Sequence, residues 1–151
     1  MSFLSSMNIS ASALTATRLR MDVIAENIAS IDTTRTETGD PYRRKYVVFQ
    51  ERHNDPTSFA SIFNKARLPV GRGGSPGGVR VLHIGNDMSD FKLDYNPSHP
   101  DADADGYVRL PNVEVVQEMT DMMAAYRSYE ANITALNAFK DMAVKTLEIG
   151  R

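Results

Sequence analysis

Apolar residues recur at alternating steps of three and four near the amino end of the chain. The positions are Leu4, Met7, Ala11, Leu14, Met21, Ala25 and Ile28, with Ile24 beside them. Arg18 is the one charged residue in the repeat. This spacing puts the side chains on one face of an α-helix and is typical of a coiled-coil seam. The pattern predicts a helix over residues 3–31.

A longer repeat of the same kind occupies the carboxyl end. Its positions are Val115, Met119, Met122, Tyr126, Tyr129, Ile133, Leu136, Ala143 and Leu147. Lys140 is the charged exception in this repeat. Asn112 is the predicted N-cap, and Gly150 fits the position just after the last helical residue. The pattern therefore predicts a helix over residues 112–149.

Two amide side chains, Asn132 and Asn137, lie close beside the second apolar stripe. A buried Asn in a coiled-coil seam lowers stability and specifies the register of the helices. The alternative is that both residues face solvent on an ordinary surface helix. The pattern alone leaves both interpretations open.

The middle of the chain has short β-type runs separated by Gly- and Pro-rich turns. The runs are "YRRKYVVFQ", "GVRVLHI", "FKLDY" and "GYVRL", and the turns include "GRGGSPGG" and "NPSHP". We predict an α+β fold in which long N- and C-terminal helices pair as a coiled coil around a small β-rich insert. The predicted divisions are an N-terminal helical core segment (1–34), the insert domain (35–110) and a C-terminal coiled-coil helix (111–151).

Both apolar stripes are wider than a pair of helices can cover, since Ile24 flanks the first stripe and Val116, Met123 and Phe139 flank the second. We therefore expect the two repeats, with Asn132 and Asn137, to pack against other subunits. The charge of the chain is −2, from 17 Lys and Arg against 19 Asp and Glu, and it gives no electrostatic reason to expect a nucleic-acid partner.

The basic cluster "YRRKY" at residues 42–46 is interpreted as a solvated strand face, or as a charge match to an acidic turn of another subunit. An acidic turn of that kind is predicted at "DADADG", residues 101–106. It resembles half of a calcium-binding loop, but the twelfth position is Asn112 instead of Glu, and Pro97 and Pro100 prevent an entering helix. We expect no metal site, although the sequence leaves open whether Asp101, Asp103 and Asp105 bind a cation.

No catalytic constellation is visible in the sequence. Cysteine is absent, the histidines are scattered, and the glycine run at residues 71–78 lacks the Lys-Ser/Thr of a phosphate loop. We therefore expect no catalytic residue, no cofactor and no small-molecule substrate, so the chain is not predicted to be an enzyme. It has neither an apolar run long enough for membrane insertion nor the pattern of a cleaved signal peptide.

Two segments carry a resemblance to a known family. They are "SALTATRLRMDVIAENIASIDTT" at residues 12–34 and the segment from "GYVRLPN" through "DMMAAYRSYEAN" to the end, residues 106–151. Together they cover about half of the chain and resemble the bacterial flagellar axial family of rod and hook proteins, most closely its proximal-rod members. The stretch "ENIASIDTT" departs from the Asn-rich "NNIANANTT" that is more usual in the family, at Glu26, Ser30 and Ile31.

The resemblance implies a structural subunit of the flagellar basal-body proximal rod. Such subunits polymerise helically through their terminal helices, with copies of themselves and other rod proteins, into the drive shaft that spans the periplasm. They leave the cytosol through the flagellar type III export apparatus without a cleaved signal peptide. The alternative is an exported coiled-coil binding module of a related secretion system, which would form one-to-one complexes. The sequence gives neither the copy number nor the helical symmetry.

Overall fold

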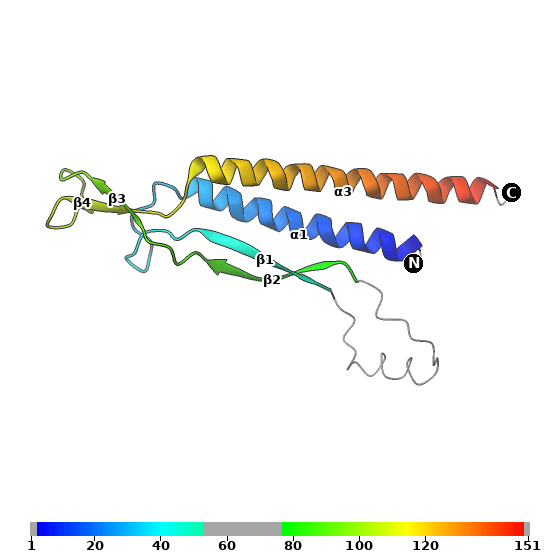
Figure 1. Ribbon diagram of the computed structural model, residues 1–151, viewed down its shortest axis with the longest axis horizontal. Coiled ribbons are helices and arrows are strands. Elements are labelled where there is room, and N and C mark those ends of the chain that lie inside the picture. The colour runs from blue at the N-terminus through cyan, green and yellow to red at the C-terminus, as the bar shows by residue number, and fades with distance from the viewer. Residues whose placement is uncertain (1–2, 53–76, 150–151) are drawn as a thin grey trace, which may run out of the picture. The chain divides into compact units, whose positions relative to one another are not determined.

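The computed structural model describes residues 3–52 and 77–149 of the chain (Figure 1). Its elements are α1 (Phe3–Ala29), β1 (Lys45–Glu51), β2 (Val79–Asn86), β3 (Lys92–Tyr95), β4 (Tyr107–Leu110) and α3 (Val115–Ile149). The α+β class is thus confirmed, with two long terminal helices and small sheets between them. No helix in the described ranges is both long and apolar enough to cross a membrane. Most of the glycine run at residues 71–78 lies outside the described residues.

Each of the four β-type runs forms a strand. β1 pairs with β2, and β3 pairs with β4 in antiparallel register from Lys92↔Leu110 to Tyr95↔Tyr107. The rings of Tyr95 and Tyr107 pack edge to face with their centroids 5.2 Å apart. Gly106 precedes β4 with a φ of 82°, and its N–H donates to the carbonyl of Asp103 at 2.8 Å. The acidic stretch is therefore a turn that leads into β4.

The start of α3 differs from the prediction. The helix begins at Val115, and its first turn is closed by the Glu118 N–H, which donates to the Glu114 carbonyl at 2.9 Å. Asn112 is not the cap, because its Oδ1 accepts a hydrogen bond from the Arg44 N–H at 2.8 Å and its Nδ2 donates to Ser89 Oγ at 2.9 Å. The N-cap prediction was therefore wrong. The side-chain amide of Asn112 joins Arg44 to Ser89 and does not cap the helix.

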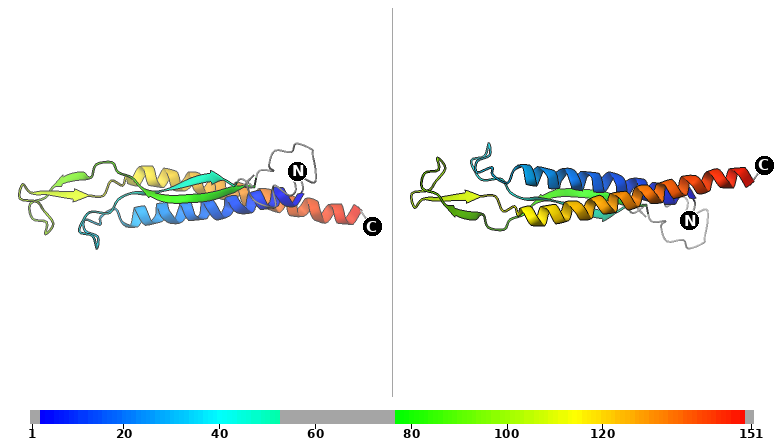
Figure 2. Two further views of the ribbon diagram at one scale, coloured as in Figure 1. Left: turned by 90° about the horizontal axis from the view of Figure 1, so that it is seen from below. Right: turned by 90° about the horizontal axis from the view of Figure 1, so that it is seen from above.

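The chain divides into two compact units, each of which takes residues from both helices and from the β1–β2 pair. Unit 1 contains residues 1–17, 49–82 and 128–151, and unit 2 contains residues 18–48 and 83–127. Within unit 2, the α1 and α3 segments lie side by side and run in opposite directions (Figures 1 and 2).

In unit 1, the start of β2 is fixed to α1 by a close backbone approach. Ser12 Oγ accepts a hydrogen bond from the Val79 N–H at 3.0 Å and donates to the Ile9 carbonyl at 2.7 Å. Gly78 has a φ of 94°, and a Cβ at that position would lie 2.2 Å from Ser12 Oγ. Only glycine fits here, on both conformational and steric grounds.

Most of the fully buried side chains of the described residues belong to unit 2. The apolar ones are Val23, Ile24, Tyr42, Val108, Val113 and Ala125. Two polar side chains, Asn27 and Glu118, are buried with them at 0% exposure. Buried polar groups need hydrogen-bond partners inside the protein, so these two residues indicate a specific hydrogen-bonded cluster in unit 2.

Candidate assembly surface and the polar cluster beside it

Asn27 uses its whole hydrogen-bonding capacity inside unit 2. Its Nδ2 donates to the Lys45 carbonyl at 2.9 Å and to Glu118 Oε2 at 3.0 Å. Its Oδ1 accepts from the Lys45 N–H and from the Tyr42 hydroxyl, both at 2.9 Å. One amide from α1 thus holds the start of β1 and the first turn of α3 together.

Glu118 is the buried charge of this arrangement. Its Oε1 accepts from Arg44 Nε at 2.5 Å, and the same guanidinium reaches Asp121 Oδ2 at 3.3 Å. The carboxylate lies in the first turn of α3, where the helix dipole also favours negative charge. We call Asn27, Tyr42, Arg44 and Glu118 the polar cluster. In the described part of the chain, no buried side-chain nitrogen or oxygen is without a hydrogen-bond partner.

The basic stretch at residues 42–46 is paired within unit 2. Arg43 lies 4.2 Å above the ring of Phe91, and Lys45 Nζ forms a 2.5 Å ion pair with Glu26. Arg44 belongs to the polar cluster. Because all three cations have partners in their own subunit, the interpretation of this stretch as a charge match to another subunit's acidic turn loses its basis.

Burial raises the pKa of Tyr42 to about 12, and the negative charges of Glu26 and Glu118 add to the effect. The folded-state pKa lies above the usual value of 10.0, so the stabilisation from the protonated hydroxyl is complete below pH 10. It is lost as the pH rises from 10 towards 12. The ionised oxygen would be buried beside two carboxylates and could no longer donate to Asn27.

We therefore expect Tyr42→Phe to be less stable than the native chain at pH 8, with a difference that shrinks above pH 10. Urea unfolding of both proteins from pH 8 to pH 11.5 measures that difference in unfolding free energy. The other titrating groups are the same in both proteins and cancel in the comparison. A difference that stayed constant up to pH 11.5 would show that the hydroxyl is not buried as described.

The predicted packing residues of α3 lie in two kinds of environment. Met122, Tyr129, Asn132, Leu136 and Ala143 are half-buried, whereas Val115, Met119, Tyr126, Ile133, Asn137 and Leu147 are exposed. Met119 is 55% exposed and Tyr126 is 59% exposed, whereas their preceding neighbours Glu118 and Ala125 are 0% and 4% exposed. One residue corresponds to about 100° around an α-helix. The buried side of α3 is thus rotated away from the centre of its apolar stripe.

α1 is rotated in the same sense. Of its predicted packing residues, Met7, Leu14, Met21 and Ile28 are half-buried, Ala11 is exposed and Ile24 is buried. The side chain of Leu4 lies outside the described part. The other fully buried side chains of α1 are Ser10, Ala16, Val23 and Asn27. Asn27 precedes Ile28 by one residue, just as Glu118 precedes Met119.

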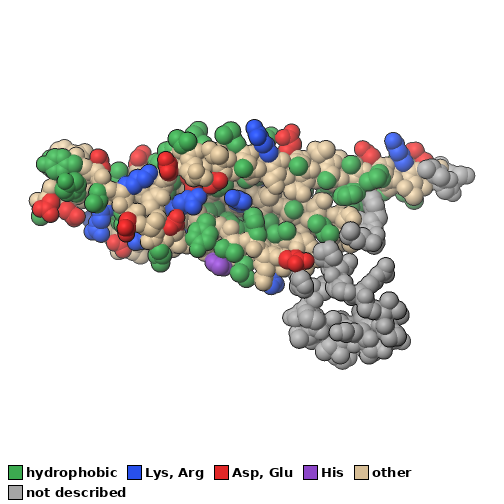
Figure 3. Space-filling model, in the orientation of Figure 1, with side chains coloured by type: hydrophobic (Ala, Val, Ile, Leu, Met, Phe, Trp, Pro, Cys, Tyr) green, Lys and Arg blue, Asp and Glu red, His purple; other side chains and the backbone are tan. Residues whose placement is uncertain are grey.

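The rotation leaves an apolar surface uncovered on the first turns of α3. We call this surface the α3 face, and its residues are Val115, Val116, Met119, Met123 and Tyr126. Hydrophobic side chains are visible along the α3 edge of the molecule in Figure 3. An exposed apolar patch of this kind marks an interaction surface, and its methionines can adapt to the shape of a partner.

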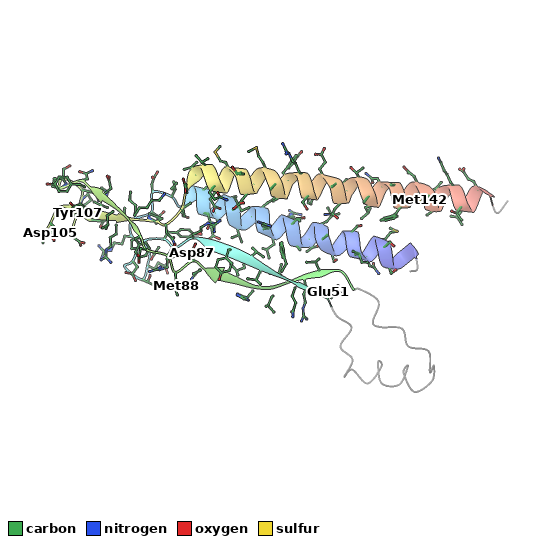
Figure 4. All side chains as sticks on the ribbon, viewed as in Figure 1. Glu51, Asp87, Met88, Asp105, Tyr107 and Met142 are labelled. Carbon is green, nitrogen blue, oxygen red and sulfur yellow. The ribbon has the colours of Figure 1, made fainter. Side chains whose placement is uncertain are left out.

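The acidic turn contains few interactions beyond its own loop. Asp101 Oδ2 accepts a hydrogen bond from Thr34 Oγ1 at 2.8 Å, while Asp103 and Asp105 are exposed. Asp105 and Tyr107 lie in the region of β3 and β4 (Figure 4). Within residues 3–52 and 77–149, no group of three or more His, Asp or Glu side chains could hold a metal ion.

Two family models match the two ends of the chain. Residues 7–35 match "Flagella basal body rod protein", and residues 104–149 match "Flagellar basal body rod FlgEFG protein C-terminal". The chain belongs to the flagellar basal-body rod protein family. It is 51% identical over 150 residues to flagellar basal-body rod protein FlgC of Bacillus subtilis (strain 168), with 97% of each chain covered.

Two other relatives have the same name. FlgC of Borreliella burgdorferi is 46% identical, with 99% of this chain and 98% of the relative covered. FlgC of Salmonella typhimurium is 40% identical over the full length of both chains. The similarity therefore includes the middle of the chain as well as the two helical ends.

Proposed function

We propose that this chain is a structural subunit of the flagellar basal-body proximal rod, which polymerises helically through its terminal helices. Its neighbours are copies of itself and other flagellar rod proteins. The observation that carries the proposal is the α3 face, an uncovered apolar surface on a chain that is similar over its full length to FlgC proteins. A helical polymer needs a surface that meets a different surface of the next subunit, so that addition does not close into a ring.

The exposed and half-buried residues of both apolar repeats are the proposed packing positions. α1 and α3 pair as a coiled coil, and their uncovered sides meet neighbouring subunits. Asn137 is exposed and its amide can reach a neighbour, whereas Asn132 is half-buried and its Nδ2 donates to the Ser128 carbonyl of its own helix at 2.9 Å. The division into segments 1–34, 35–110 and 111–151 belongs to the same proposal.

The subunit works in the part of the rod that spans the periplasm, and it reaches that place through the flagellar type III export apparatus. It acts without catalysis, cofactor, small-molecule substrate or nucleic acid.

Deletion of the gene tests the proposal. We expect the deletion strain to be non-motile and to yield no complete rods when its basal bodies are purified and imaged by electron microscopy. A plasmid copy should restore both properties and should bring the chain into the purified basal bodies. Normal rods in the deletion strain would exclude the proposal, and soluble one-to-one complexes would favour an exported binding module.

A further inference from the structure

We infer that the polar cluster sets the rotation of α3 about its own axis and so determines which side of the helix is left for neighbouring subunits. The meaning of the exposed side rests on the proposed function. The rotation itself does not, because it follows from contacts within unit 2.

Apolar burial alone would place α3 differently. The strongest apolar stripe in this region is centred on Val115, Met119 and Tyr126, and burial of such side chains is favourable. The structure instead buries Glu118 and Ala125. A buried carboxylate costs desolvation free energy, and a small alanine recovers little, so the observed rotation needs a specific cause.

The polar cluster provides that cause because it holds Glu118 from two directions. Asn27 donates to Oε2 from α1, and Arg44 donates to Oε1 from the residue before β1. Asn27 is itself fixed by both backbone groups of Lys45, so its amide cannot follow a moving helix.

A second contact acts in the same direction. Asp121 lies three residues after Glu118, on the same side of α3, and pairs with the same Arg44 guanidinium. The backbone N–H of Arg44 is held by Asn112. One anchored cation thus holds two carboxylates of α3, and together they define one rotation of the helix.

The polar cluster lowers the stability of the subunit relative to an apolar core, but it specifies which side of α3 stays exposed. If α3 were free to turn by about one residue's step, Met119 and Tyr126 would move inside and the α3 face would be lost. The subunit would bury the apolar stripe of α3 internally and would expose less apolar surface to a neighbour. The polar cluster prevents this.

Single cysteines can test the rotation, because the chain contains none of its own. Ala125→Cys reports on the buried side of α3, and Tyr126→Cys reports on the exposed side. Each is combined with the double change Arg44→Ala and Glu118→Ala, which removes the polar anchor and leaves the apolar stripe. The rate of thiol modification of the purified protein is then measured.

We expect reciprocal changes relative to the same reporters in the native background. The cysteine at position 125 should react about ten-fold faster, and the cysteine at position 126 about ten-fold slower. Unfolding of the helix end would instead make both positions reactive. Fast reaction at both positions, or unchanged rates, would overturn the inference.

Two further variants control the test. Glu114→Ala with Arg18→Ala makes the same chemical changes at two exposed positions, one just before α3 and one on α1, and should alter neither rate. Glu118→Gln keeps the shape of the side chain and loses only its charge, so it should fold and give changes in the same directions of about three-fold. Absence of a reciprocal change in this milder variant would also overturn the inference. None of these measurements involves the rod, so their failure would leave the proposed function standing.

Discussion

Replacement of Asn27 by leucine is expected to lower the free energy of unfolding by about 4 kcal/mol, a large fraction of the stability of a small protein. Leucine has nearly the same size but can neither donate nor accept a hydrogen bond. The substitution would leave the Lys45 backbone groups, the Tyr42 hydroxyl and one oxygen of Glu118 without this partner. Each buried polar group left unpaired costs about 1 to 3 kcal/mol, and the costs are not simply additive.

Urea unfolding followed by circular dichroism measures this effect. Asn8→Leu is the matched control, because Asn8 is exposed on the same helix and the chemical change is identical. We expect the control to change stability by about 0.5 kcal/mol or less. Equal effects of the two substitutions would contradict the description of Asn27 as the centre of a buried cluster.

Met119→Asp is expected to abolish incorporation of the subunit into rods without unfolding it. Met119 is largely exposed in the subunit, so a carboxylate there remains hydrated and does little harm to the fold. At a packed interface, the same carboxylate would lose its water without gaining a partner, at a cost of several kcal/mol. A cost of about 3 kcal/mol already reduces an association constant more than 100-fold.

Quantitative immunoblots of purified basal bodies measure the amount incorporated. Gln117→Asp is the matched control, because it adds the same charge two residues away, at an exposed position outside the α3 face. Circular dichroism should give the same helix content for both variants. Normal incorporation of Met119→Asp would show that the α3 face is not an assembly surface. Met122→Asp is less informative, since Met122 is half-buried and the change would also disturb the subunit itself.

The regular elements could be predicted from the sequence because their signals are local. The first residues of β2 alternate between half-buried and exposed side chains, and Gly78 directly precedes the strand. The two helices have long 3/4 repeats without an internal Gly or Pro, so neighbouring residues alone predict them. The helix ends were less accurate. α3 begins three residues later than expected, and the side chain of Asn112 bonds to the backbone of Arg44, the residue before β1, instead of capping the helix.

The rotation of the helices could not be predicted in the same way. A hydrophobic repeat predicts burial from the apolarity of each side chain. It therefore predicts that the polar side chains of Glu118 and Asn27 are exposed to solvent. Their burial depends on partners distant in the sequence: Arg44 is 74 positions from Glu118. The one available signal was the basic stretch at residues 42–46, a concentration of cations that needs acidic partners. From the sequence, that stretch is interpreted as a solvated strand face or as a charge match to another subunit, because its partners are distant in the sequence.

The hydrogen bond between Asn27 and Glu118 closes a loop of 91 positions. Closing a flexible loop of that length costs roughly 4 kcal/mol in chain entropy, and this loss comes before the contact can stabilise the fold. Such long-range contacts slow folding, and this one cannot form until Glu118 has been synthesised. A chain still emerging from the ribosome therefore holds the α1 part of unit 2 without its α3 partner until residues 115–127 have been synthesised.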